Sequence, residues 1–322
     1  YGGTASFNNS GTFKKSAGSG ITYMDVPFVN TGTVDVQIGT VSLRGGGSNT
    51  NAFNVSGASA TLLFAIGVFN LDAGTTITGP GTVLLNSTGT LNVTSALAIP
   101  AATTFPFLAE TLGGTGTLTT NGTFNWSGGV MTGAGITTVN GPFNLSGLVG
   151  INGNRTLNNA STATWTSATG DGMWTGTGSV INNTGTWDSQ TDTVYIVNHY
   201  GGATTFNNSG TFKKSAGSGI TYMDIPFVNT GTVNVQTGTF SLRGGGSSTN
   251  ALNVPAASST LLFASGVFNL HAGTTFSGPG TVLLNSSGTL NVNAPVSFPA
   301  ATTFTFLAGT LGGTGAVTTN GT

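Results

Sequence analysis

A short motif returns along the chain, and its form and spacing limit the possible folds more than any other feature. Each copy has an apolar residue, one or two Asn, a hydroxyl residue, Gly, Thr and a second apolar residue. Gly and Asn tolerate the positive backbone angles of tight corners. The motif therefore predicts a strand, a corner and the start of the next strand. It occurs at residues 7–13, 28–34, 181–187, 206–212 and 227–233, with a looser copy at 157–159.

The spacing of these copies predicts a coil. From Leu157 to Phe227 they begin 24, 25 and 21 residues apart, which is typical of one turn of a β-solenoid. Between the motifs, apolar and polar residues alternate, as in residues 33–38, a pattern of strands with one buried face. No window shows a helical period. We expect an all-β, right-handed parallel β-solenoid with roughly 22 residues per coil.

A much longer repeat is superimposed on the coils. Tyr1–Thr123 aligns with Tyr200–Thr322 at a constant offset of 199 residues, and about 27 of the 123 aligned positions differ. Each coil of a solenoid contacts only its neighbours, so such units can follow one another without limit. The alignment predicts a complete unit at residues 1–199 and a partial second unit at 200–322, continuous with the first.

The composition excludes several classes of function. Seven basic and eight acidic residues give a net charge of −1, too little charge for nucleic acid or an anionic membrane to be a partner. No apolar run approaches the roughly 20 residues that cross a bilayer, so we expect no membrane insertion. A hydrophobic content of 37% exceeds that of disordered chains. The chain has no Cys, and we expect no cofactor and no metal.

Stacking the coils by the motif predicts specific neighbours. Asn183, Asn208 and Asn229 fall at one corner, where each side-chain amide can bond to the next, as in stacked Asn ladders. Trp187 falls beside Phe212 in the interior. We expect both sets to stabilise the stacking of the coils.

The same alignment predicts two ion pairs. Asp188 falls opposite Lys213 on the next coil, and Asp25 occupies nearly the same phase as Arg44. Opposite charges on neighbouring strands attract, so each pair is expected to lie within contact distance.

Candidate catalytic groups are few, and we predict that the protein is not an enzyme. His199 and His271 lack sequence neighbours that would complete a metal site or a nucleophilic triad. Asp171, Asp188 and Asp192 could supply the two carboxyl groups of a polysaccharide-cleaving site. In the repeated part, however, most acids are lost between copies: Asn234 replaces Asp35, His271 replaces Asp72 and Gly309 replaces Glu110.

Two binding functions remain as alternatives. The four Trp residues could stack on sugar rings if they shared an exposed face, although such residues more often fill a core. Thr-x-Thr pairs, such as Thr184 and Thr186, are used by some solenoids to bind ice. Here the intervening residue is mostly Gly, which favours a corner over a flat strand. The Trp residues are Trp126, Trp165, Trp174 and Trp187.

Residues 206–246, together with residues 117–129, resemble the repeats of very large bacterial surface proteins with β-strand repeats, which are similar in style to filamentous adhesins. The resemblance implies an exported β-solenoid, extracellular or on the cell surface, that serves adhesion, biofilm matrix building or filament formation. It carries over no catalytic residue. We therefore expect a non-catalytic repeat segment of an extracellular filament or adhesin stalk. Its expected partners are other copies of itself and surface polysaccharide. The alternatives are a carbohydrate-binding or polysaccharide-cleaving β-helix and, less favoured, an ice-binding solenoid.

Overall fold

The computed structural model describes residues 5–320, so the outer limits of the two predicted repeat units, Tyr1 and Thr322, lie outside the described part. The chain forms two compact units. The N-terminal unit contains the residues up to Asn144 together with Val149–Leu157, and the C-terminal unit contains Leu145–Leu148 together with the residues from Asn158 onward. All regular elements of the described residues are β-strands.

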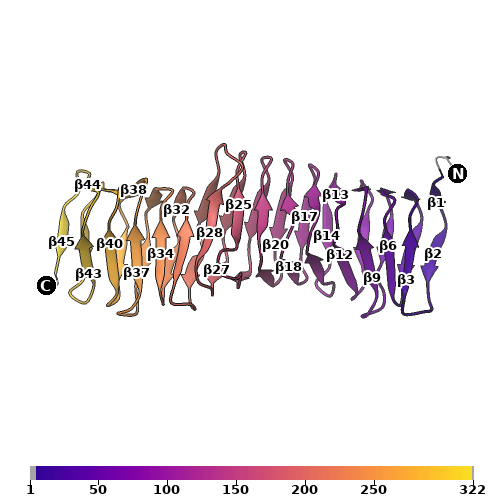
Figure 1. The fold of residues 1–322 in the computed structure, drawn as a ribbon, viewed down its shortest axis with the longest axis horizontal. Coiled ribbons are helices and arrows are strands. Elements are labelled where there is room, and N and C mark those ends of the chain that lie inside the picture. The colour runs from indigo at the N-terminus through magenta and orange to yellow at the C-terminus, as the bar shows by residue number, and fades with distance from the viewer. Residues whose placement is uncertain (1–4, 321–322) are drawn as a thin grey trace. The chain divides into compact units, whose positions relative to one another are not determined.

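Each unit is a parallel β-solenoid with about 21 residues per turn, which confirms the predicted fold class. Most strands pair in parallel with the strand three places further along the chain, for example β1 with β4 and β31 with β34. Three consecutive strands therefore make one coil, and the coils stack so that equivalent strands lie side by side within each unit (Figure 1). The right-handed winding and the 199-residue unit remain predictions.

In the N-terminal unit the strands form three faces. The first face contains β1 (Phe7–Asn9), β4 (Phe28–Asn30), β7 (Gly47–Asn49), β10 (Val68–Leu71), β13 (Thr90–Val93), β16 (Thr111–Gly113), β19 (Val130–Met131) and β22 (Val149–Ile151). The second contains β2 (Thr12–Lys15), β5 (Thr33–Val36), β8 (Ala52–Asn54) and β11 (Thr76–Thr78), and then, as a separate sheet, β14 (Leu97–Ile99), β17 (Thr117–Thr120) and β20 (Ile136–Val139). The third contains β3 (Ile21–Met24), β6 (Thr40–Leu43), β9 (Thr61–Phe64), β12 (Thr82–Leu85), β15 (Phe105–Phe107) and β18 (Phe124–Trp126). Strands β21 (Phe143–Leu145) and β23 (Thr156–Asn159) include residues of both units.

The C-terminal unit repeats this arrangement. One face contains β25 (Gly172–Thr175), β28 (Val194–Asn198), β31 (Ile220–Met223), β34 (Thr239–Leu242), β37 (Thr260–Phe263), β40 (Thr281–Leu284) and β43 (Thr303–Phe306). The next contains β26 (Val180–Asn183), β29 (Thr205–Asn208), β32 (Phe227–Asn229), β35 (Gly246–Ser248), β38 (Val267–Leu270), β41 (Thr289–Val292) and β44 (Thr310–Gly312). The last contains β24 (Thr162–Trp165), β27 (Thr186–Ser189), β30 (Thr211–Lys214), β33 (Thr232–Val235), β36 (Ala251–Asn253) and β39 (Thr275–Ser277), with β42 (Val296–Phe298) and β45 (Val317–Thr319) pairing separately.

Alternation along the strands creates the core. In β9 the side chains of Leu62 and Phe64 are buried while those of Thr61 and Leu63 are half-buried on the outer side, because successive side chains of a strand point to opposite faces. Aromatic rings fill much of the interior. Phe105 and Phe124, for example, stack with ring centroids 5.3 Å apart.

The strand that stacks on Phe28 begins with Gly and carries no copy of the motif. Phe28 is paired with Gly47, whereas Phe53, the next Phe along the chain, is paired with Val34 on another face. Gly47 has a φ of 131°, and a Cβ there would lie 2.0 Å from the carbonyl oxygen of Phe28. The backbone approach at this position requires Gly, so the apolar residue that marks other coils is missing.

Candidate functional site

Four buried Asn residues form a column in the C-terminal unit, here called the Asn ladder: Asn159, Asn183, Asn208 and Asn229. Each lies at the end of a strand, just before a corner. The side-chain amide Nδ2 of Asn159 donates to Oδ1 of Asn183 at 2.8 Å, that of Asn183 donates to Asn208 at 2.7 Å, and that of Asn208 donates to Asn229 at 2.8 Å. The predicted ladder residues Asn183, Asn208 and Asn229 thus lie in one continuous chain of hydrogen bonds.

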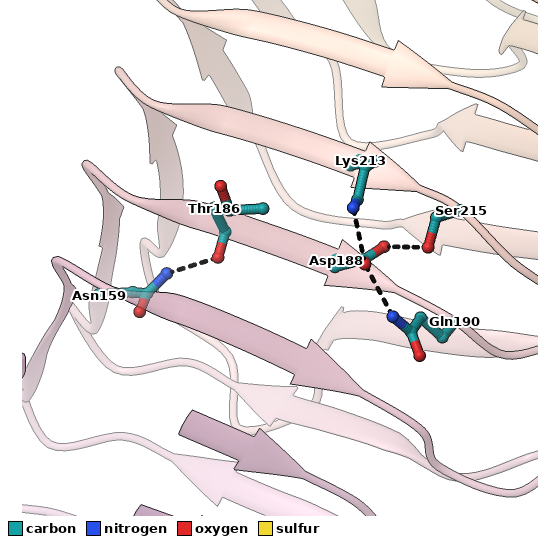
Figure 2. Close-up of polar contacts among 6 residues, drawn as sticks. All are labelled: Asn159, Thr186, Asp188, Gln190, Lys213 and Ser215. Carbon is teal, nitrogen blue, oxygen red and sulfur yellow. Dashed lines mark hydrogen bonds and ion pairs between the residues drawn. The ribbon is translucent and has the colours of Figure 1, made fainter. Parts of the chain in front are cut away.

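The Asn ladder also binds the backbone across the corner. Nδ2 of Asn159 donates to the carbonyl oxygen of Thr186 at 2.9 Å (Figure 2), and Asn183 and Asn208 donate to Thr211 and Thr232 at 3.0 Å. Buried polar groups are costly unless they are paired. Each rung therefore favours one alignment of the coils, because a shift by one residue would leave these amides without partners.

A second column of the same kind lies in the N-terminal unit. Asn9 donates to Asn30 at 2.6 Å, and Asn30 donates to Asn49 at 2.5 Å. Asn49 was not predicted from the sequence, because its strand, β7, begins with Gly47 instead of an apolar residue. The conserved spacing from the Asn to the next corner was the signal that could have identified it.

Trp187 and Phe212 are opposite each other on β27 and β30, and both side chains are fully buried. The ring of Trp187 meets that of Phe206 edge-on at 5.2 Å, and Phe206 meets Phe212 in the same way at 5.8 Å. The apolar stack thus lies inside the coil, beside the Asn ladder.

Asp188 is the centre of a polar cluster on the outer side of β27 (Figure 2). Its Oδ2 lies 3.0 Å from Nζ of Lys213 on the next coil and accepts a hydrogen bond from Gln190 at 2.8 Å. Its Oδ1 accepts a hydrogen bond from the hydroxyl of Ser215 at 2.6 Å. The Asp188 side chain is only 5% exposed, so its charge is held by three donors from two coils.

The N-terminal unit contains a matching group that the sequence prediction missed. Asp35 accepts hydrogen bonds from Gln37 at 2.8 Å and from Ser56, on the next coil, at 2.6 Å. Both clusters share the spacing Thr-x-Asp-x-Gln, at residues 33–37 and 186–190, which was the available signal. In the second copy of the repeat, Asn234 replaces Asp35 and Pro255 replaces Ser56. The acceptor and the donor are thus lost together, as expected for residues that act as a pair.

The second predicted ion pair lies at a more exposed position. Nε of Arg44 is 3.2 Å from Oδ1 of Asp25, with side chains 38% and 64% exposed. Its counterpart, Arg243 with Asp224, has a distance of 2.9 Å, and Asp224 is only 14% exposed. Burial raises the pKa of Asp224, and Arg243 partly offsets this effect. Each Arg also covers a Tyr ring on the same sheet.

Arg155 is a buried cation that the sequence prediction did not identify. Its guanidinium donates to the hydroxyl of Thr137 at 2.8 Å and to the carbonyl oxygen of Gly114 at 3.2 Å. Burial lowers the pKa of Arg155 to about 10. Its partners come from two coils, so Arg155 acts as another link between neighbouring coils.

Several of the candidate catalytic residues are engaged in contacts of other kinds. Asp188 is engaged as described, Asp192 accepts a hydrogen bond from the backbone amide of Gly219, and the ring of His199 stacks on Trp174 at 3.7 Å. Among residues 5–320, no cluster of three or more His, Asp or Glu side chains could hold a metal ion. No helix suited to crossing a membrane is present in the same range.

Most of the predicted sugar-stacking residues are unavailable to a ligand. Trp126, Trp165 and Trp187 are fully buried, whereas Trp174 is half-buried on the outer side of β25. A shared platform of four Trp residues is therefore wrong, and only Trp174 can contact a ligand.

Comparison of the chain with protein-family models, curated proteins and solved structures finds no match. The main feature of the geometry is a set of polar and apolar columns that link each coil to the next.

Proposed function

We propose that this chain is a segment of the shaft of an extracellular filament or adhesin stalk, with no catalytic role. The Asn ladder is the observation that supports the proposal most directly. It links four successive coils through buried amides, in addition to the backbone bonds between strands. In parallel, in-register stacks such bonds act together, and opening one coil requires breaking several at once.

The polar clusters support the same function. Asp188 and Asp35 each bond to a side chain of the following coil, so a force along the stacking direction would meet side-chain bonds as well as backbone bonds. The proposal includes right-handed winding, tandem repetition of the 199-residue unit, association with further copies, and a place outside the cell.

Single-molecule pulling and electron microscopy test the shaft proposal. Pulling the full chain from its two ends is expected to give a series of unfolding steps, with lower forces in Asn208→Ala than in the parent chain. Microscopy is expected to show end-joined particles whose length increases with protein concentration. Particles that remain single at every concentration, together with one low-force unfolding step unchanged in Asn208→Ala, would contradict the shaft function.

A further inference from the structure

We propose that the outer face of β25, β28 and β31 in the C-terminal unit binds a neutral saccharide, with Trp174 and Tyr195 as the contact residues. This binding function goes beyond the shaft function, because a shaft needs only contacts between coils.

The aromatic side chains on this face lie on the outer positions of neighbouring strands. Trp174 and Tyr195 are both half-buried and point away from the core, opposite in direction to their buried neighbours Met173 and Ile196. Tyr222 continues the row on β31 and stacks on Tyr195 with ring centroids 4.9 Å apart and planes 6° apart. Flat, rigid rings with polar edges suit a ligand whose rings carry both C–H faces and hydroxyl groups.

Gly172 leaves one face of the Tyr195 ring without a covering side chain from β25. It lies opposite Tyr195 in the pairing of β25 with β28, so β25 supplies no side chain to cover that face of the Tyr195 ring. The other face is occupied by Tyr222, whose own far side is covered by Arg243 at 4.6 Å. On the same outer side of β25, Trp174 lies two residues beyond Gly172 and opposite Val197, two residues beyond Tyr195 on β28.

Trp174 is held in place by its own neighbours. The ring of His199 stacks on Trp174 with planes 8° apart, and Tyr200 meets the Trp174 ring edge-on at 6.3 Å. His199 and Asn198 are exposed beside it, and their polar atoms can bond to hydroxyl groups. A ring fixed in advance binds with less loss of conformational entropy.

The charges on this face favour a neutral ligand. Arg243, the cation over the Tyr222 ring, is paired with Asp224 at 2.9 Å, and Asp171 precedes Gly172 in the chain. An anionic saccharide would find no free cation in the row and would meet the negative charge of Asp171. A neutral saccharide has hydroxyl groups for the polar edges and C–H faces for the open ring.

Isothermal titration calorimetry of the full chain tests this site, with cellohexaose, maltohexaose and chitohexaose as neutral probes and polygalacturonate as the anionic probe. We expect at least one neutral hexasaccharide to bind. Trp174→Ala and Tyr195→Ala should each weaken that binding by about tenfold, as for aromatic residues at the centre of an interface. Tyr195→Phe keeps the ring and should retain the affinity.

Tyr23→Ala is the matched control. Tyr23 is the first-copy counterpart of Tyr222; it is 54% exposed and lies under Arg44. This variant should bind like the parent chain. The proposal is overturned if no neutral hexasaccharide binds, if polygalacturonate binds more tightly, or if Trp174→Ala and Tyr195→Ala, with unchanged circular dichroism, bind like the parent. None of these results would affect the pulling test of the shaft.

Discussion

The same sequence, FNNSGTFKK, occurs once in each unit, at residues 7–15 and 206–214, and its side chains have different surroundings. Phe7 is 40% exposed whereas Phe206 is fully buried. In the described part of the chain only Ala5 and Ser6 precede Phe7, whereas the coil of β26 to β28 precedes Phe206 and packs against it. Burial at a given position of a solenoid is therefore supplied by the neighbouring coil.

Lys15 and Lys214 show the same difference in a charged residue. Nζ of Lys15 is exposed and donates to the carbonyl oxygen of Ala17 at 3.5 Å. Nζ of Lys214 donates to the carbonyl oxygens of Thr191 at 2.8 Å and Ala216 at 3.2 Å, and its side chain is fully buried. Burial lowers the pKa of Lys214, and Asp192 partly offsets this effect. The pairing and the electrostatic environment of Lys214 thus come largely from the preceding coil, through Thr191 and Asp192.

The buried Asn columns give the largest expected difference in stability between the two copies. Asn208→Ala removes a side chain that both accepts and donates within the ladder, and it leaves buried partners unsatisfied. We expect a loss of about 3 kcal/mol in the local free energy of opening. Asn9→Ala removes a side chain that donates to Asn30, Thr33 and Gly11 but, within residues 5–320, accepts no bond from another Asn, and it should cost about 1 kcal/mol. Amide hydrogen exchange of the flanking strands measures both values, and equal losses would contradict the comparison.

Glu110 and Gly309 occupy equivalent positions in the two copies of the repeat. They give the second largest expected difference in stability. Glu110 has a φ of 90° and Gly309 a φ of 96°, a region that favours Gly. Both carboxylate oxygens of Glu110 are buried without a hydrogen bond among the described residues. Burial raises the pKa of Glu110 to about 8, although the backbone of Gly89 offsets part of the effect.

The pKa of Glu110 predicts how stability depends on pH. In the unfolded chain the carboxyl loses its proton near pH 4.5, whereas in the folded chain it keeps the proton to about pH 8. The folded state therefore binds more protons in this window, and the N-terminal unit should lose stability as the pH rises from 4.5 to 8. Allowing for solvent screening, we expect a loss of about 2 kcal/mol.

Glu110→Gly should abolish that pH dependence and stabilise the N-terminal unit further by relieving the backbone, by about 1 kcal/mol. Urea denaturation at pH 5 and pH 8, followed by Trp fluorescence, to which Trp126 contributes from the N-terminal unit, measures the effect. An unchanged pH profile in Glu110→Gly would show that another group is responsible.

Asp188 and Asp35 provide the next comparison. Asp188→Asn leaves Lys213 without its partner and weakens the bond to Ser215, and we expect a cost of about 1.5 kcal/mol. Asp35→Asn should cost about 0.5 kcal/mol, because this carboxylate is half-buried and, within the described residues, Lys14 forms no ion pair with it although it lies opposite on β2. Raising the salt concentration from 0.05 to 0.5 M should reduce the cost of Asp188→Asn more than that of Asp35→Asn. Hydrogen exchange at the two salt concentrations measures both costs. A reversed order would contradict the assigned contacts.

The smallest expected difference concerns the two Arg residues. Arg243→Ala should cost about 1 kcal/mol, because its partner Asp224 is largely buried. Arg44→Ala should change stability by less than about 0.5 kcal/mol, because both of its partners are exposed. Thermal unfolding of the two variants under matched conditions measures this difference, which a similar shift in both would contradict.

Much of the Asn ladder could be predicted from the repeated motif. Asn183, Asn208 and Asn229 occur at the same place in successive motifs, and parallel stacking brings equal places together. The rung at Gly47–Asn49 could not be found in this way, because the backbone approach to Phe28 replaces the apolar residue by Gly. The Ser partners of Asp188 and Asp35 were harder to predict, because Ser215 and Ser56 lie just past the ends of β30 and β8, where the alternating strand pattern stops.

The sequence by itself determined the class of fold: a period near that of one coil, strict alternation within strands, and Gly and Asn at the corners are compatible with little else. Only the tertiary structure decided which copy of a residue is buried, which Asp is bonded to the next coil, and that Trp174 alone among the four Trp lies on the outer side. The physical reason is that these properties depend on the adjacent coil, about 21 residues away, and on corners that vary in length. Local sequence specifies the strand, whereas its surroundings arise when the coils stack.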